Sequence, residues 1–217
     1  MSGFDFYLEN IGCNDETGSF QNSWLDQQKS INILPSAAGD NNAWTRQGTD
    51  SGANWSQVDE VTPNDITDYV QSNTLNQIDD YNCAASGLTD EVIDMLAVGV
   101  RKARLTGLNP ASFVLRSKAA SGGTVEESSA ITTTFTAWHH NVSGATPVAR
   151  LFQLILYDLP GASTTAWTPT DLDAMQIGYR LSATSLIEVW ISTAWACVSY
   201  HAAATADQRR RLLAQVV

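Results

Sequence analysis

Short runs of apolar and β-branched residues, separated by clusters of Gly, Pro, Asn, Asp and Ser, extend along most of this chain. Such runs are typical of β-strands, because side chains alternate between the two faces of a strand and turn residues separate successive strands. Residues 91–107 and 150–159 also fit a helical period, and two glycines favour a strand for the first of them. The pattern predicts strands within residues 31–35, 43–48, 53–61, 68–72, 76–85, 91–107, 112–119, 125–138 and 186–201.

Two local signals predict a tight turn and a helix. Residues 121–123 (Ser-Gly-Gly) lie between two strand-like segments, and glycine readily adopts a positive φ, so we expect a β-hairpin there. Thr168 or Thr170 can cap a short helix that carries Pro169 and Asp171 in its first turn. We expect the chain to continue from this helix into a further strand.

Many short strands and few helices predict an all-β protein, an antiparallel β-sandwich of jelly-roll-like architecture. Residues 1–30 are polar with isolated aromatic side chains, and are interpreted as an extended N-terminal arm. Residues 31–201 form the predicted β-sandwich domain, and residues 36–42 are interpreted as a loop within it. Residues 202–217 form a C-terminal tail that we expect to contain a short helix.

Charge is distributed unevenly along the 217 residues, which carry a formal net charge of −11. Residues 1–90 contain fourteen acidic and two basic residues, whereas residues 91–217 contain nine acidic and ten basic ones. The first part would repel the phosphates of DNA or RNA, and the second has no dense basic field to attract them. Arg209, Arg210 and Arg211 are interpreted as a solvated helix end, so no nucleic-acid partner is expected.

Cysteine spacing and hydropathy bear on the cell compartment. Cys13, Cys83 and Cys197 lie far apart, form no CxxC motif and are expected to be reduced thiols. The first residues lack the basic and apolar segments of a signal peptide, and no apolar run reaches the roughly 18 residues of a membrane span. We therefore expect a protein assembled in the cytoplasm, with no membrane partner.

Residues that could carry catalysis are few. His139, His140 and His201 are the three histidines, and the chain contains no GxSxG, GxxxxGK[ST], GxGxxG or HExxH motif. Paired carboxylates for glycoside hydrolysis could be drawn from the acidic residues between 59 and 68 and from Glu126 and Glu127, but no separation between them follows from the sequence. We predict a non-enzymatic protein without catalytic residues and without a cofactor.

An acidic segment offers the best candidate for a metal site. Asp59, Glu60, Asp65 and Asp68, with the amide of Asn64, place oxygen atoms of the kind that Ca²⁺ prefers within ten residues. Their spacing differs from that of an EF-hand loop, and a solvated turn between strands explains the same residues. No metal is therefore predicted, and these four carboxylates are the calcium candidates.

The seven tryptophans could either pack in the core or present their rings to a ligand. Rings exposed on a β-sandwich could stack on sugars, which would make the protein a carbohydrate-binding adhesin module. Trp190 and Trp195 are five residues apart, so a continuous strand would point them to opposite faces. We therefore expect the tryptophans in the core or in subunit interfaces, and these two on no common platform.

Two stretches carry a resemblance that spans roughly residues 31–201. They read VDEVTPNDITDYVQS at residues 58–72 and WTPTDLDAMQIGYR at residues 167–180, with a polar IDDYN segment between them. Their order resembles that of a broad family of tailed-bacteriophage virion structural proteins, β-sandwich proteins that serve in head decoration, necks and tails. No catalytic residues belong to the family pattern, so the resemblance assigns none to this chain.

The resemblance implies a structural part of a phage particle, located in the virion after assembly in the cytoplasm of the bacterial host. We expect a capsid decoration (cement) subunit that stabilises the head by protein–protein contacts, or alternatively a neck, tail or fibre component. The expected partners are the major capsid protein, or neck and tail proteins, together with further copies of this chain in a homo-oligomer. Residues 1–30 and 202–217 lie outside the resemblance and are expected to decide where the subunit docks.

Overall fold

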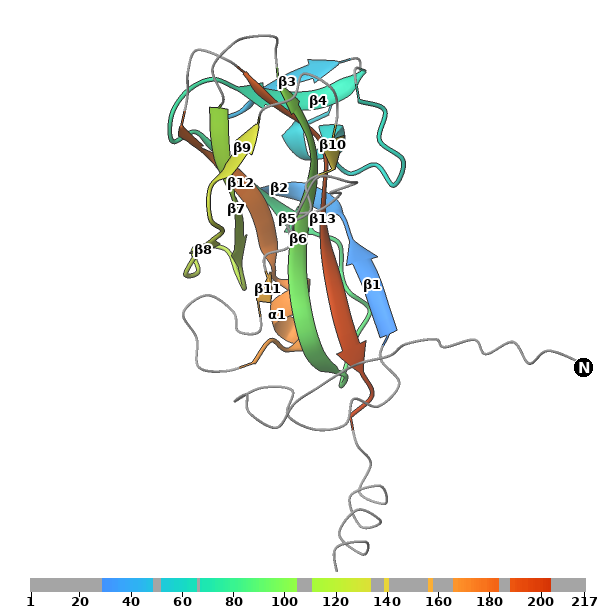
Figure 1. Ribbon diagram of the computed structural model, residues 1–217. Helices are drawn as coiled ribbons and strands as arrows, with labels where there is room; N and C mark the ends of the chain where they lie inside the picture. The colour runs from blue at the N-terminus through green and yellow to red at the C-terminus, as the bar shows by residue number, and fades with distance from the viewer. Residues whose placement is uncertain are drawn as a thin grey trace, which may run out of the picture.

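Two antiparallel sheets pack face to face as a β-sandwich (Figure 1). This computed structural model describes residues 29–48, 52–65, 67–104, 111–133, 139–140, 156–157, 166–183 and 188–203. The predicted all-β sandwich is confirmed. Of the predicted N-terminal arm, Lys29 and Ser30 belong to the first strand and the remainder lies outside the described residues, as does the predicted C-terminal helix.

Seven strands form sheet A, in the order β10-β6-β13-β4-β3, with β1 paired to β13 and β11 paired to β6. The two longest strands, β6 and β13, lie side by side along the length of the sandwich (Figure 1). The strand predicted within residues 91–107 is therefore confirmed. The bounds in sheet A are β1 (Lys29–Ile33), β3 (Thr45–Gly48), β4 (Asp68–Ser72), β6 (Val92–Arg104), β10 (His139–His140), β11 (Leu156–Tyr157) and β13 (Val189–His201).

Six strands form sheet B, in the order β2-β5-β12-β7-β8, with β9 also paired to β7. The predicted hairpin is confirmed, because residues 119–125 turn the chain from β7 into β8 and Gly122 has a φ of 67°. The bounds in sheet B are β2 (Pro35–Asn42), β5 (Ile78–Cys83), β7 (Ala111–Lys118), β8 (Glu126–Glu127), β9 (Ile131–Thr133) and β12 (Gln176–Ala183).

The hydrophobic core lies between the two sheets. Every second residue of a strand faces it, so the same strand supplies the core from one face and polar side chains from the other. Sheet A contributes mainly aliphatic side chains, whereas sheet B also contributes aromatic ones. Among the fully or almost fully buried members are Leu96, Val98, Val100, Ala196 and Val198 from sheet A, and Tyr81, Phe113, Leu115, Ile177, Tyr179 and Leu181 from sheet B.

The helix α1 (Pro169–Asp173) begins where the sequence predicts it. Thr168 caps it, because its hydroxyl accepts a hydrogen bond from the Asp171 backbone amide at 3.2 Å. The Asp171 carboxylate in turn accepts one from the Thr168 backbone amide at 2.9 Å, which completes a capping box. Leu172 is fully buried and fixes the helix against the core ahead of β12.

Two segments differ from their predicted structure. Residues 36–42, predicted as a loop, belong to strand β2, because their backbone pairs with β5 at Ala37 and Ala38. Residues 53–61, predicted as a strand, instead contain the 3₁₀ helix η1 (Asn54–Gln57). The Asn54 side chain donates hydrogen bonds to the Trp44 carbonyl and to Asp79, and these tertiary contacts favour the turn over an extended chain.

The chain crosses between the sheets twice near its start. A single residue, Leu34, separates β1 of sheet A from β2 of sheet B, and its carbonyl accepts a hydrogen bond from the Ala84 amide at 2.9 Å. Ala43 and Trp44 then carry the chain back from β2 to β3 in sheet A. The second crossing brings backbone amides next to the middle of the core.

Candidate functional site

A cluster of polar side chains lies inside the sandwich at the second crossing. Asp79 of β5 faces the core with none of its surface exposed. Its Oδ1 atom accepts hydrogen bonds from the backbone amides of Ala43 at 2.6 Å and Trp44 at 2.8 Å. Its Oδ2 atom accepts hydrogen bonds from the Asn54 amide at 2.7 Å and the Tyr81 hydroxyl at 2.9 Å. Asp79 therefore ties the crossing and η1 to sheet B.

The Asp79 cluster extends to a second tyrosine. The Tyr179 hydroxyl lies 2.5 Å from that of Tyr81, and the Tyr179 ring packs edge-on against Trp44 with centroids 4.6 Å apart. Burial raises the pKa of Asp79 above its ordinary value, while its hydrogen bonds to Trp44, Asn54, Tyr81 and Ala43 act in the opposite direction. All four hydrogen-bond donors to Asp79 are neutral, so this carboxyl is satisfied without a counter-ion.

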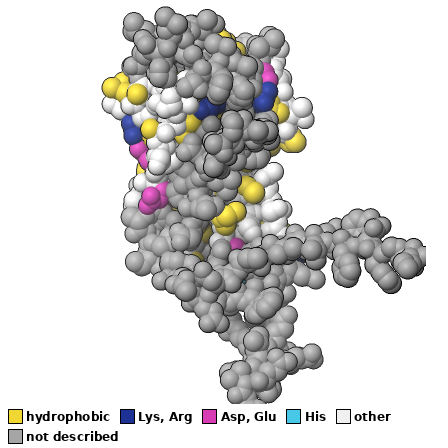
Figure 2. Space-filling model, in the orientation of Figure 1, with side chains coloured by type: hydrophobic (Ala, Val, Ile, Leu, Met, Phe, Trp, Pro, Cys, Tyr) yellow, Lys and Arg dark blue, Asp and Glu magenta, His cyan; other side chains and the backbone are white. Residues whose placement is uncertain are grey.

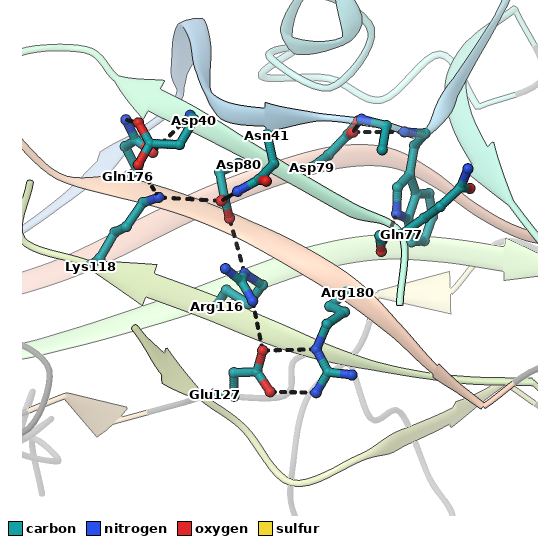
Figure 3. Close-up of polar contacts among 12 residues, drawn as sticks. Asp40, Asn41, Gln77, Asp79, Asp80, Arg116, Lys118, Glu127, Gln176 and Arg180 are labelled. Atoms are coloured by element: carbon teal, nitrogen blue, oxygen red, sulfur yellow. Dashed lines mark hydrogen bonds and ion pairs between the residues drawn. The ribbon is translucent and has the colours of Figure 1, made fainter. Parts of the chain in front are cut away.

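The next residue, Asp80, lies on the opposite face of β5 and belongs to an ion-pair network (Figure 3). Arg116 donates from Nε to Asp80 at 3.0 Å, and Lys118 Nζ lies 3.3 Å from the other carboxylate oxygen. Arg116 also contacts Glu127 at 2.7 Å. Arg180 forms a bidentate pair with Glu127, in which its two nitrogen atoms donate to the two carboxylate oxygens at 2.9 and 2.5 Å. Although this face is the outer one, Asp80 is 2% and Arg116 7% exposed.

Asp40 closes the network at its other end. It lies where the pairing of β2 with β5 shifts register, and it accepts hydrogen bonds from Lys118 Nζ at 2.5 Å and from the Gly122 amide at 2.7 Å. The Gly122 amide, followed by Lys118 and Ser121, holds the pKa of Asp40 well below its usual range. The pKa of Glu127 is also lowered, and the hydrogen bond from Arg180 contributes most to this shift.

The charges of this network balance. Three carboxylates and three cationic side chains form one connected series across β2, β5, β7, β8 and β12, and it binds five strands of sheet B together. The members are Asp40, Asp80, Glu127, Lys118, Arg116 and Arg180. Each interior member contacts two opposite charges, which offsets the cost of removing it from water.

The network requires a glycine at its centre. Gly178 of β12 lies directly between Asp80 of β5 and Arg116 of β7 in the strand pairing. A Cβ atom at Gly178 would lie 2.8 Å from the Asp80 carboxylate and 2.0 Å from the Asp79 carbonyl oxygen. The absence of a side chain therefore lets Arg116 reach across β12 to Asp80.

A further buried charge, Lys102, lies on the core face of β6. It is 6% exposed, donates a hydrogen bond to the Thr132 carbonyl at 3.2 Å and lies with its ammonium 5.4 Å from the centre of the Phe113 ring. No carboxylate of the described residues forms a salt bridge with it. Burial lowers the pKa of Lys102 to about 8.

The four calcium candidates do not converge. Asp65 receives both prongs of the Arg101 guanidinium at 2.6 Å, so a cation of the protein already balances its charge. Asp68 accepts a hydrogen bond from Asn64 at 2.5 Å, and Asp59 and Glu60 are half-buried ahead of this turn. In the ranges that the structure describes, no three His, Cys, Asp or Glu side chains are placed to hold a metal ion.

The other residues singled out in the sequence are dispersed. His201 Nδ1 lies 2.8 Å from Asp94 at the ends of β13 and β6, and Glu127 is held by arginines in the network above. His139 and His140 form β10 beside Arg101 and Lys102 of β6. Cys83 and Cys197 are free thiols, and Cys13 lies outside the described residues.

The two tryptophans of β13 lie on the same face, and the prediction of opposite faces is wrong. The pairing of β13 with β6 skips Ser192, a β-bulge that shifts the alternation by one residue. Trp190 is opposite Ala103 and Trp195 is opposite Gly99, positions four residues apart on β6 and hence on one face. A spacing rule that assumes a regular strand cannot anticipate this shift.

Tyr69 of β4 joins these tryptophans, and we call Tyr69, Trp190 and Trp195 the aromatic strip. The Tyr69 and Trp190 rings have centroids 5.1 Å apart. The Trp195 ring lies over Gly99, where a Cβ atom would come within 2.5 Å of it. All three side chains of the strip are partly exposed, on the outer face of sheet A.

Sequence reasoning missed the two polar clusters of sheet B. Asp79 and Asp80 appear in the sequence only as part of a polar segment, although Ile78, Tyr81 and Cys83 around them are typical of a buried strand. Two adjacent acidic residues inside such a strand indicate one carboxylate on each face, and each needs partners there. The partners themselves come from distant parts of the chain.

No helix within the described ranges is both long and apolar enough to cross a membrane. No family model, no curated protein and no solved structure matches the chain.

Proposed function

We propose that the protein is a non-enzymatic structural subunit of a tailed-bacteriophage virion, a capsid decoration (cement) protein that stabilises the head by protein–protein contacts. The observation that carries the proposal is the position of the two stretches that resemble phage virion proteins. Both belong to the framework of the sandwich: residues 58–72 begin directly after η1 and include β4, and residues 167–180 include α1 and most of β12.

The side chains of these stretches support a structural role. Val58 and Val70 of the first stretch, and Leu172 and Ile177 of the second, are fully buried in the core. The polar residues between them cap α1 or form hydrogen bonds within the sandwich. The stretches therefore act as packing and capping elements, which is the role expected of a pattern shared by structural proteins.

The network of sheet B fits a subunit that is repeated in a particle. Ion pairs across five strands hold sheet B together, and a preorganised surface loses little conformational freedom when subunits associate. Identical subunits then bury the same surfaces repeatedly under the symmetry of the particle. The partners in this proposal are the major capsid protein and further copies of this chain.

Binding to empty phage capsids tests the proposal. The purified chain is mixed with capsids that lack it, and co-sedimentation and electron microscopy measure binding and its location. We expect many copies spread over the head surface and a higher temperature of capsid disruption. A single ring of copies at the neck or tail would support the runner-up, a neck, tail or fibre component. A chain that binds neither capsids nor tails would overturn the proposal.

A further inference from the structure

The side chain of Gln57, the last residue of η1, is buried without a hydrogen-bond partner. None of its surface is exposed, and neither its amide oxygen Oε1 nor its amide nitrogen Nε2 forms a hydrogen bond within the described residues. An amide that leaves water loses its hydrogen bonds to solvent, which is costly unless other groups replace them. Buried polar groups are for this reason almost always paired, either with protein groups or with an ordered water molecule.

The chain on both sides of Gln57 keeps its side chain in the interior. At the start of η1, the Asn54 side chain donates a hydrogen bond to Asp79 of sheet B at 2.7 Å. Directly after η1, the Val58 carbonyl accepts a hydrogen bond from the Ala194 amide of β13, in sheet A, at 2.9 Å. Val58 is itself fully buried, and η1 packs against β2, β3 and β4. Because each side is tied to a different sheet, Gln57 cannot turn its amide toward solvent without breaking these contacts.

A second unused polar atom lies on the same face of η1. Residues three apart in a 3₁₀ helix lie one above the other, and Asn54 and Gln57 are the two buried residues of η1. The Asn54 nitrogen donates to the Trp44 carbonyl and to Asp79, whereas its Oδ1 atom accepts no hydrogen bond from the described part of the chain. This face of η1 therefore presents two acceptor oxygens and one donor nitrogen.

We propose that the face of η1 formed by Asn54 and Gln57 binds at least one internal water molecule, a site that is independent of the proposed role in the virion. A water molecule both donates and accepts hydrogen bonds, so it can pair with the nitrogen and with the oxygen of an amide. Buried water molecules typically make about three hydrogen bonds to polar groups that lack other partners. The three unused atoms on this face match that requirement.

The polar atoms of the site favour water over an ion or a larger solute. A cation would leave the Nε2 donor of Gln57 unpaired. An anion would leave both oxygens unpaired and would lie close to the Asp79 carboxylate, which Asn54 contacts. A larger neutral solute would have to pass between η1 and the strands that it packs against. Water alone pairs with every atom of the site and is small enough to reach it.

Oxygen-17 magnetic relaxation dispersion of the full chain tests the inference, because it counts the water molecules that stay bound for longer than the protein takes to tumble. Gln57→Met keeps the length of the side chain and removes both polar atoms. We expect this variant to hold at least one long-lived water molecule fewer than the parent. The matched control Gln47→Met, at a half-buried position of β3, should leave the count unchanged. Equal counts in the parent and Gln57→Met, or an equal loss in both variants, would overturn the proposal.

A measurement on the unsubstituted chain keeps the test decisive if Gln57→Met does not fold. In nuclear magnetic resonance spectra, the Overhauser effect between water and the side-chain amide protons of Gln57 should have the sign of a long-lived contact, unlike that of Gln47. A high-resolution crystal structure should show water within hydrogen-bond distance of Gln57. The proposal fails if the amide instead bonds only to protein atoms, or if its Overhauser effect matches that of Gln47. None of these results depends on whether the chain binds capsids.

Discussion

Asp79 and Asp80 are neighbours on β5, yet the two faces of sheet B satisfy their carboxylates in different ways. Asp79 points into the core and accepts four hydrogen bonds from neutral donors, two of them backbone amides. Asp80 points outward and pairs with two cationic side chains, Arg116 and Lys118. Strand alternation alone places the two carboxylates in these separate environments.

The comparison shows how the groups left behind decide the cost of losing a buried carboxylate. The Trp44 amide has only Asp79 as an acceptor among the described residues, whereas the Ala43 amide, the Asn54 side chain and the Tyr81 hydroxyl also contact the Ile78 carbonyl, the Trp44 carbonyl and the Tyr179 hydroxyl. The partners of Asp80 each contact another carboxylate, Glu127 for Arg116 and Asp40 for Lys118. The inner cluster is therefore expected to be the more sensitive of the two.

Removing the inner carboxylate has the largest expected effect. Asp79→Ala leaves the Trp44 amide buried without an acceptor and removes one acceptor each from the Ala43 amide, the Asn54 side chain and the Tyr81 hydroxyl, and we expect a loss of about 3 to 5 kcal/mol in unfolding free energy. Urea denaturation measures the loss. Tyr179→Phe removes only a hydroxyl that contacts Tyr81 and not Asp79. It should lower the unfolding free energy by about 1 kcal/mol and serves as the control. A loss below about 1 kcal/mol for Asp79→Ala would contradict the importance of this cluster.

Removing the outer carboxylate should cost less. Asp80→Ala is expected to lower the unfolding free energy by about 2 kcal/mol, because Arg116 and Lys118 keep one carboxylate each. The same urea experiment measures it, and Arg116→Met together with Asp80→Ala should cost less than the sum of the two single changes. The comparison would be reversed if Asp80→Ala proved more costly than Asp79→Ala.

Lys102 supplies the contrasting case of a buried cation without a carboxylate partner among the described residues. Replacing it with Met should raise the unfolding free energy at pH 7 by about 1 to 2 kcal/mol, because the buried charge is removed and the side-chain volume is kept. Its pKa falls from 10.5 in the unfolded chain to about 8 in the folded protein, so the unfolded chain holds more protons between these values. The parent should therefore gain stability as pH rises from about 8 to 10.5, and the variant should lack this gain. If the unfolding free energy changed with pH in the same way in both proteins, the lowered pKa of Lys102 would be contradicted.

The smallest expected effects concern acid pH, where Asp40 and Asp79 should change the stability of the protein in opposite directions. Asp40 has a lowered pKa in the folded protein, so its contribution to stability is present above pH 3.8 and is lost as pH falls further. Asp79 has a raised pKa, and its titration acts in the opposite sense, since the stability it contributes is lost as pH rises through the folded value. Asp40→Asn should reduce the difference between melting temperatures at pH 6 and pH 3, and Asp79→Asn should enlarge it. Equal differences in both variants and the parent would contradict these signs.

The sequence predicts the strands and the capped helix well, because these depend on local patterns. Thr168, Pro169 and Asp171 specify the start of α1 without help from the rest of the chain. The alternation in β6 also carries its own signal over thirteen residues. Predictions failed where distant contacts decide the backbone, as in η1, which is held by hydrogen bonds from Asn54 to Trp44 and Asp79.

The candidate sites depend on pairing register, which a single sequence does not reveal. The meeting of Asp80 and Arg116 requires Gly178 to lie between them in adjacent strands, and these residues are 36 or more positions apart. The aromatic strip depends on one skipped residue, Ser192, whose bulge has no distinctive sequence. A regular strand would have separated Trp190 from Trp195.

The pairing of β1 with β13 also determines how the sandwich would respond to force. Lys29, at the start of β1, is paired with Tyr200, near the end of β13. The start of β1 and the end of β13 therefore lie side by side at one end of the sheet. Tension applied between these two points would open the hydrogen bonds one after another, as a zipper opens, instead of loading them together in shear. β1 would peel away at low force until the chain reached Leu34 and Pro35, where the crossing into sheet B begins. The sandwich beyond that point would bear the load.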